Sequence, residues 1–299
     1  MEYFLTCHFH EKDIKTNKDN INIQGILMKK IQDICLTKDN IREIPCCPGG
    51  LEVRGKKFVG ELDQVLRWRK KMLEKGMRGF ISYHEEIARG FIEYMPVEVA
   101  PLPIEAPGSA VLMCYHWVPR GNNEEEHLPQ EKRLIELTIE DAKEKFSGIV
   151  TLGWNNPVHF PIKMLEEMGF KEVETYDYLS LMWLPFENNM KNPRMIQSKY
   201  EPKNLFSEGL LAIDQAYSTR CPYSIHNAER VKKLIDEIND ERICYSIHRI
   251  DDREEAIKWS ISPWNWEWLF FNGDEINLFD KKSKDLKKMI LDRIDKLGD

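Results

Sequence analysis

The 299-residue sequence lacks any apolar run near the roughly 20 residues that a membrane-spanning helix needs. Its amino terminus, MEYFLTCHFHEKDIK, lacks the positive start and apolar core of a secretory signal peptide. It also lacks a basic excess, since the formal net charge is −7, whereas affinity for a phosphate backbone grows with lysines and arginines gathered on one face. These absences predict a cytoplasmic protein that binds neither membrane nor nucleic acid.

The cysteines lack the density and spacing of a disulfide scaffold or a zinc site. There are seven, scattered at positions 7, 35, 46, 47, 114, 221 and 244, and no two have the C-x-x-C spacing that lets two thiolates reach one metal ion. We therefore expect free thiols and no structural metal.

What the sequence does contain is enough for two compact domains. It is 42% hydrophobic and 31% charged, a composition typical of globular proteins. Residues 1–27 are polar with little periodicity and are predicted to be an amino-terminal extension. The segment FENNMKNPRMIQSKYEPKN (residues 186–204) is polar, has two prolines and no period, so we place a domain boundary near residue 200. This divides the chain into domains of residues 28–200 and 201–299.

The first domain alternates strand and helix patterns. Helices are predicted over 61–75, 130–146 and 160–168, and the first of them places Arg69 on its apolar face beside Val65 and Met72. Strands are predicted over 31–36, 78–86, 88–99, 111–118, 148–154 and 178–186, the second and third forming a hairpin. This order predicts an α/β domain with a mixed sheet.

The second domain reads as βαβαββα. Strands are predicted over 209–217 and 242–250, helices over 223–238 and 253–259, and a hairpin over 266–279 that turns at Asn272-Gly273, followed by a lysine-rich terminal helix. A Cys-Pro pair stands at the first strand-to-helix junction, and Ser262-Pro263 precedes the hairpin.

Cys221 of that Cys-Pro pair is a candidate thiol site, together with Pro263. A thiol at a helix amino terminus faces unpaired backbone N–H groups and the positive end of the helix dipole, and Arg220 is its neighbour, so we expect the pKa of the thiol to be lowered. Ser224 stands where a resolving cysteine would be, which argues against a dithiol cycle. The alternative is that Cys221 fills space in the fold without chemistry.

The order of several segments resembles a GNAT-superfamily acyltransferase domain joined to a YoaP-type thioredoxin-like domain. The segments that carry the resemblance, over roughly residues 29–285, are LTKDNIREIPCC, GFIEYMPVEVAPLPI, CYHWV, IEDAKEKFSGIVTL, MGFKEVETYDYLSLMWLPF, CPYS and LFFNG. The resemblance implies a GNAT-like mixed-sheet domain followed by a smaller thioredoxin-like βαβαββα domain.

It also implies acetyl-CoA as donor and a small-molecule amine or peptide as acceptor. By this resemblance Tyr176 and Tyr178 are the best-placed proton donors for the leaving thiolate, and the alternative is that each is a packed aromatic residue. The loop and helix start after the central strand would hold the CoA pyrophosphate, with candidates Val118, Arg120, Gly121, Lys132 and Arg133. Pro129 and Glu131 stand at the positions where the family has loop glycines.

Glu93 is the candidate base, because it lies on a strand between apolar neighbours, where desolvation would raise its pKa. Alternatively it faces outward on an alternating strand. The resemblance therefore implies an acyl-CoA-dependent N-acyltransferase with an appended monothiol module. The alternative is a non-catalytic ligand- or partner-binding protein with a degenerate CoA loop and a thiol-binding second domain.

Overall fold

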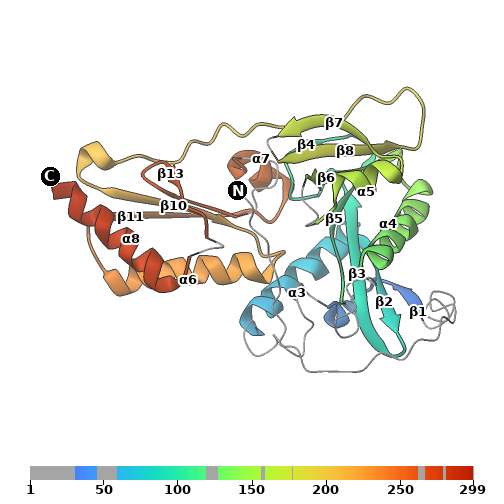
Figure 1. Cartoon of the computed structure of the whole chain (residues 1–299), viewed down its shortest axis with the longest axis horizontal. Helices are drawn as coiled ribbons and strands as arrows, with labels where there is room; N and C mark the ends of the chain where they lie inside the picture. The colour runs from blue at the N-terminus through green and yellow to red at the C-terminus, as the bar shows by residue number, and fades with distance from the viewer. Residues whose placement is uncertain are drawn as a thin grey trace, which may run out of the picture.

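The computed structural model describes residues 31–45, 59–118, 127–155, 159–176, 178–261, 267–278 and 281–298. These residues form two α/β units that lie side by side (Figure 1). The predicted extension at residues 1–27 lies outside them. Within the described ranges, no helix is both long and apolar enough to cross a membrane.

The first unit is built on a seven-stranded sheet with the strand order β1-β2-β3-β5-β6-β8-β7. Neighbouring strands are antiparallel except for β5 and β6, which are parallel, so the predicted mixed sheet is confirmed. The strands are β1 (Ile31–Cys35), β2 (Arg78–His84), β3 (Ile87–Pro96), β5 (Ser109–Trp117), β6 (Gly148–Trp154), β7 (Lys171–Tyr176) and β8 (Leu179–Pro185).

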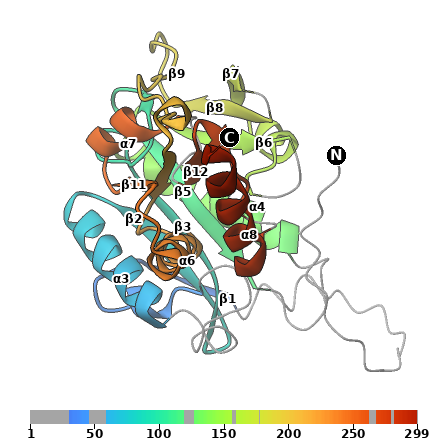
Figure 2. The ribbon, with the colours of Figure 1, turned by 90° about the vertical axis from the view of Figure 1, so that its left-hand side faces the viewer.

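Helices cover both faces of this sheet (Figure 2). One face packs against α3 (Val59–Glu74) and the short 3-10 helix η1 (Ile41–Glu43), and its core includes Trp68, Met72 and Phe91. The other face packs against α4 (His127–Lys143) and α5 (Ile162–Glu167). A two-stranded sheet of β4 (Ile104–Glu105) and β9 (Arg194–Met195) joins the core on the α3 face. Strands β4, β7 and β9 were not predicted from the sequence.

The second unit has the predicted βαβαββα order, and its four strands lie in the order β11-β10-β12-β13. Strands β10 and β11 are parallel, and the other pairs are antiparallel. The elements are β10 (Leu211–Tyr217), α6 (Pro222–Ile238), β11 (Ile243–Arg249), α7 (Arg253–Trp259), β12 (Trp268–Phe271), β13 (Asp274–Glu275) and α8 (Ser283–Asp295), with short 3-10 helices η3 (Phe206–Glu208) and η4 (Lys296–Gly298). Helices α6 and α8 share one apolar core, and α7 belongs to another.

The segment between the units contacts each of them in turn. Ile196 N donates to Pro103 O of the first unit at 2.7 Å. Tyr200 Oη lies 3.1 Å from His248 Nε2, and Lys203 N donates to Asp214 Oδ2 at 2.7 Å, both in the second unit. The contacts thus change from one unit to the other between residues 196 and 200. The domain boundary near residue 200 stays a prediction, because the units also touch elsewhere.

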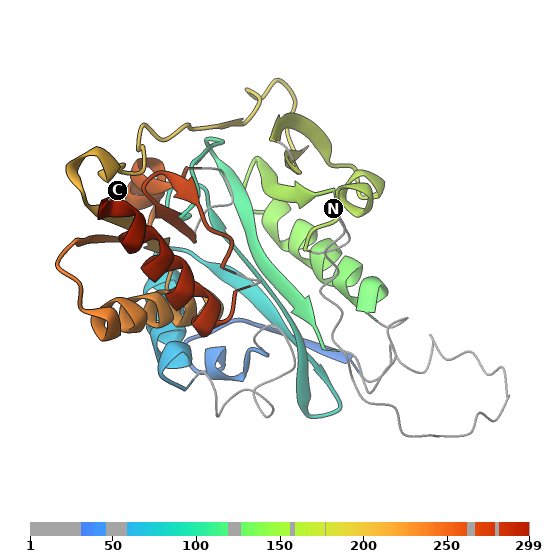
Figure 3. The ribbon, with the colours of Figure 1, turned by 60° about the vertical axis from the view of Figure 1, so that its left-hand side comes forward.

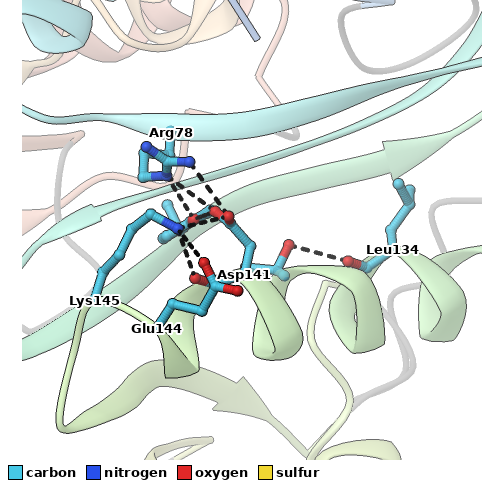
Figure 4. Close-up of polar contacts among 7 residues, drawn as sticks. Arg78, Leu134, Asp141, Glu144 and Lys145 are labelled. Carbon is cyan, nitrogen blue, oxygen red and sulfur yellow. Dashed lines mark hydrogen bonds and ion pairs between the residues drawn. The ribbon is translucent and has the colours of Figure 1, made fainter. Parts of the chain in front are cut away.

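A cluster of hydrogen-bonded polar side chains connects the carboxyl end of α4 to the sheet (Figure 4). Arg78 of β2 donates from Nε to Asp141 Oδ2 at 2.9 Å, Lys145 donates from Nζ to Asp141 Oδ1 at 2.8 Å, and Tyr94 Oη also donates to Asp141. Partial burial acts to raise the pKa of Asp141, but the hydrogen bonds from Arg78, Lys145 and Tyr94 outweigh it and lower this pKa to about 2.

Replacing Asp141 with asparagine should lower the free energy of unfolding by about 1–2 kcal/mol at pH 7. The folded pKa of Asp141 lies below the unfolded value, so its stabilisation is present above about pH 4 and is lost as the pH falls toward about 2. Urea unfolding of wild type and Asp141→Asn should therefore differ at pH 7 and converge near pH 2, with the exposed Asp63→Asn as control. An equal difference at both pH values would contradict this role of the carboxylate.

Candidate active site

Strands β5 and β6 diverge after a short parallel pairing. They pair at Ser109–Gly148, Ala110–Ile149 and Val111–Val150, although β5 runs on to Trp117 and β6 to Trp154. One side-chain contact follows, in which Thr151 Oγ1 donates to Leu112 O at 3.3 Å. Beyond it, the carboxyl ends of the two central strands are separated within one sheet. We call this the β5–β6 gap.

Backbone groups of β5 border the gap. Val118 N donates to Arg89 O at 2.6 Å, so this N–H points toward β3. Because successive N–H groups of a strand alternate in direction, those of Tyr115 and Trp117 point the other way, toward the gap. Such an edge can pair with an extended ligand that carries its own amides.

A β-bulge marks the strand next to the gap. The register between β3 and β5 shifts so that Glu93 lies opposite Cys114 while Tyr94 lies opposite Leu112, which leaves Met113 as an extra residue. Consequently Met113 and Cys114 both pack toward the α3 face, whereas Leu112 packs toward the α4 face. Bulges of this kind redirect side chains and are common beside active sites.

Glu93 is buried on the α3 face and is 2% exposed. Its neighbours Phe91 and Met95 belong to the core on that face, as alternation along β3 requires. Arg69 of α3, itself 4% exposed, forms an ion pair with Glu93. The alternative that Glu93 faces outward is therefore wrong, and the salt bridge fixes its carboxylate next to Cys114.

Tyr115 links β5 to the loop that follows β6. Its hydroxyl accepts a hydrogen bond from Phe160 N at 3.0 Å, and its ring stacks on His159 at 5.2 Å. Burial first, and then the charge of Glu131, raise the pKa of Tyr115 well above its usual value. His159 and Phe160 have positive φ angles of 31° and 48°, which are unusual for bulky residues and often occur at functional sites. Tyr115 was not among the site residues predicted from the sequence.

The two predicted tyrosine donors occupy different places. Tyr178 is 44% exposed, and its ring lies 5.5 Å from that of Trp154, the last residue of β6. Tyr176 lies on the edge strand β7, where its hydroxyl accepts a hydrogen bond from Gln197 Nε2 at 3.1 Å. Tyr178 is thus the tyrosine next to the end of β6 that borders the gap.

Of the residues predicted to hold a pyrophosphate, Lys132 and Arg133 lie on α4. Val118 ends the described part of the chain before the loop, and Arg120 and Gly121 lie outside the described residues. Lys132 is half-exposed and lies 3.8 Å from Glu167. Arg133 is bound to the sheet instead, because its guanidinium donates to Asp33 Oδ2 at 2.5 Å and to Ser82 Oγ at 3.0 Å.

Cys221 caps the amino end of α6 and is followed by Pro222 at the first helical position, as predicted. The expected lowering of its pKa is wrong. Burial of the thiol raises its pKa to about 12 and outweighs the hydrogen bond from the backbone of Ser224 and the charge of Arg220. Pro263, its predicted partner, lies outside the described residues.

The rate of alkylation tests whether the raised pKa makes Cys221 less reactive than an exposed thiol. Brief iodoacetamide treatment of the native protein at pH 7 should label the exposed Cys35 faster than Cys221, since the thiolate is the reactive form and burial disfavours it. Peptide mass spectrometry gives the extent of labelling at each site, and labelling in denaturant should remove the difference. Faster labelling of Cys221 in the native protein would show that the helix terminus lowers the pKa of its thiol by more than burial raises it.

Two further ionisable groups near Cys221 have shifted pKa values, and of these Glu267 was not predicted from the sequence. Glu267 accepts a hydrogen bond from Asn227 Nδ2 at 2.5 Å, and burial raises its pKa to about 7. Burial lowers the pKa of the Arg220 guanidinium to about 10. Within the described ranges, no three histidine, cysteine, aspartate or glutamate side chains gather as a metal ion would require.

Comparison with known proteins gives one curated relative with a stated activity. No protein-family model matches the chain. The chain is 26% identical over 246 residues to the uncharacterized N-acetyltransferase YoaP of Bacillus subtilis (strain 168), an alignment that covers 80% of this chain and 90% of YoaP.

Solved structures resemble about half of the chain. A putative acetyltransferase of Salmonella typhimurium with acetyl-CoA is 10% identical, with a TM-score of 0.37 over 54% of this chain and 96% of that protein. A GNAT-family acetyltransferase of Brucella melitensis in complex with acetyl-CoA is 15% identical, with a TM-score of 0.37 over 55% of this chain and 93% of that protein.

Proposed function

We propose that this chain is an acetyl-CoA-dependent N-acetyltransferase of the GNAT type. The observation that carries the proposal is the β5–β6 gap, in which two parallel strands diverge after three paired residues and leave backbone N–H groups of β5 along one side. The similarity to YoaP over most of both chains supports the same activity. The acceptor is an amine.

The gap fits the pantetheine arm of CoA, which is extended and carries amides that can pair with a strand edge. The N–H groups of Tyr115 and Trp117 would hold this arm. The first turn of α4, whose backbone N–H groups have no acceptor within the helix, and Lys132 in its second turn would oppose the pyrophosphate. Arg133 is already engaged with Asp33 and Ser82, and a role at the phosphate would require it to leave them.

Bound acetyl-CoA would supply the acetyl group as a thioester, whose C–S bond breaks as the C–N bond to the amine forms. Glu93, fixed by Arg69 beside the bulge, would accept the proton that the ammonium must lose, directly or through a water molecule. Tyr178, whose ring lies beside that of Trp154 at the end of β6, would donate a proton from Oη toward the departing sulfur. Tyr115 would position the loop after β6 rather than react.

The second unit is proposed to be thioredoxin-like. Its support is the βαβαββα order, the strand order β11-β10-β12-β13 and a Cys-Pro pair at the start of α6. Because Ser224 occupies the position of a second thiol, a dithiol cycle is not part of the proposal.

Steady-state kinetics test the donor site. Purified full chain should transfer acetyl from acetyl-CoA to members of an amine panel, followed as acetylated product by mass spectrometry. Lys132→Ala should raise the KM for acetyl-CoA by about fivefold, the value of one charge near a helix terminus. Lys145→Ala, two residues beyond the carboxyl end of α4, should leave it unchanged. If acetyl-CoA binds but no amine is acetylated, the chain is instead a binding protein.

A further inference from the structure

The sheet of the second unit has two edges that are built differently. At one edge lies β13, which has only two residues, Asp274 and Glu275, both exposed. At the other edge lies β11, whose seven residues include no proline and pair with β10 in unbroken register. Soluble proteins protect a sheet edge by making it short, charged, bulged or covered. The β13 edge has such protection, whereas β11 is long and regular.

The backbone of β11 presents hydrogen-bonding groups at this edge. Ile250 N, directly after the strand, donates to Tyr217 O of β10 at 2.8 Å. Because successive residues of a strand point their backbone groups in opposite directions, the even-numbered residues of β11 face β10. The N–H and C=O groups of Tyr245, Ile247 and Arg249 therefore point away from β10, and no other described strand pairs with β11.

One face of β11 is only partly covered. Ile243 and Tyr245 pack against the core under α6 and α8, which lie side by side on this face of the sheet (Figure 3). Ile247 points to the same face, because side chains alternate along a strand, but it is 44% exposed. An apolar neighbour at the edge would bury Ile247.

The two ends of β11 carry opposite charges. Glu241 precedes the strand and is exposed, and Arg249 ends it with a side chain that is 56% exposed. When two copies of β11 are paired antiparallel with Tyr245 opposite Tyr245, Glu241 of each copy lies opposite Arg249 of the other. In the same register Ile243 lies opposite Ile247. The strand is thus complementary to itself in backbone, apolar contact and charge.

We propose that β11 is a dimer interface and that its partner is a second copy of this chain, paired antiparallel about Tyr245. The two-fold axis is perpendicular to the sheet, so α6 and α8 of both copies cover the same face, and the two four-stranded sheets become continuous. Arg249, whose Nε lies 3.1 Å from Asp251 Oδ2, also binds Glu241 of the second copy. The neighbouring register, with Tyr245 opposite Ile247, would place Glu241 opposite Asp251 and is disfavoured by their like charges. The dimer does not depend on the acetyltransferase activity.

Sedimentation equilibrium of the full chain over a concentration series tests the dimer. We expect a species of twice the 35.4 kDa mass of one chain, with a dissociation constant in the micromolar range. Ile247→Lys should raise this constant by about tenfold or more, because the two-fold axis places the new charge in the interface twice. Leu291→Lys changes a leucine of α8 that is 42% exposed and should leave the constant unchanged. A monomer at every concentration, or equal effects of the two variants, overturns the proposal.

Charge reversal tests the contact between Glu241 and Arg249. Glu241→Arg and Arg249→Glu should each raise the dissociation constant by about three- to tenfold, because each places like charges opposite one another twice. The variant with both changes should regain the wild-type constant, since each new arginine again faces a glutamate. A double variant weaker than either single variant would contradict the pairing.

A cross-link reports the register. In the proposed pairing the native Cys244 lies opposite Ser246 of the second copy at a non-hydrogen-bonded position, where Cα atoms are about 4.5 Å apart and a disulfide can form. Ser246→Cys should therefore give a covalent dimer on oxidation with diamide, seen by non-reducing gel electrophoresis. Wild type and the double variant Ser246→Cys with Cys244→Ser should not. Circular dichroism checks that each variant folds. A dimer of Ser246→Cys that does not cross-link overturns this register.

Discussion

Replacing Arg69 with methionine is expected to lower the free energy of unfolding by about 3–5 kcal/mol. The guanidinium of Arg69 and the carboxylate of Glu93 are 4% and 3% exposed, and they form an ion pair between α3 and β3. Removing one partner leaves the other charge buried in the core, which costs far more than the loss of a surface pair. Urea unfolding followed by circular dichroism measures the change.

Two variants make this result specific. Arg67→Met alters an exposed arginine on the same helix and should change the free energy of unfolding by less than about 0.5 kcal/mol. The double variant Arg69→Met with Glu93→Gln removes both charges and should recover part of the loss. If Arg69→Met were as mild as Arg67→Met, the ion pair would not support the site as described.

Hydrophobic periodicity predicted the helices, the central strands and the edge strand β1, but not the opposite edge strand β7. The apolar periodicity over residues 130–146 predicted a helix, which the structure has as α4 (His127–Lys143), with Leu134, Ile135 and Ala142 buried. Strand β7, with the sequence KEVETY, has no buried residue and forms through pairing with β8. A strand defined by its partner rather than by an apolar face leaves little periodic signal.

The candidate site could be predicted in part. For Glu93 between apolar neighbours, a buried carboxylate was one of two interpretations, and the helix pattern over residues 61–75 placed Arg69 on the apolar face. That these two residues pair depends on how α3 crosses β3. With 50 aspartates and glutamates in the chain, the sequence offered no way to choose the partner of Arg69.

Cys221 shows where local rules failed. The Cys-Pro junction and the helix start were predicted correctly, yet the direction of the pKa shift was wrong. The local effects of the helix terminus and Arg220 act as expected, but burial outweighs them. The loop before Cys221 is held by Asp251, and Trp68 of the first unit donates a hydrogen bond to the backbone of Asp251. Docking between units cannot be inferred from a local motif.

Calorimetric titration of acetyl-CoA into the purified full chain tests the central claim most directly. The β5–β6 gap and the start of α4 predict one site per chain with a dissociation constant in the micromolar range, corresponding to about −8 kcal/mol. CoA should bind the same site and compete with acetyl-CoA. Absence of heat, together with no thermal shift at millimolar acetyl-CoA, would contradict an acetyl-CoA-dependent enzyme.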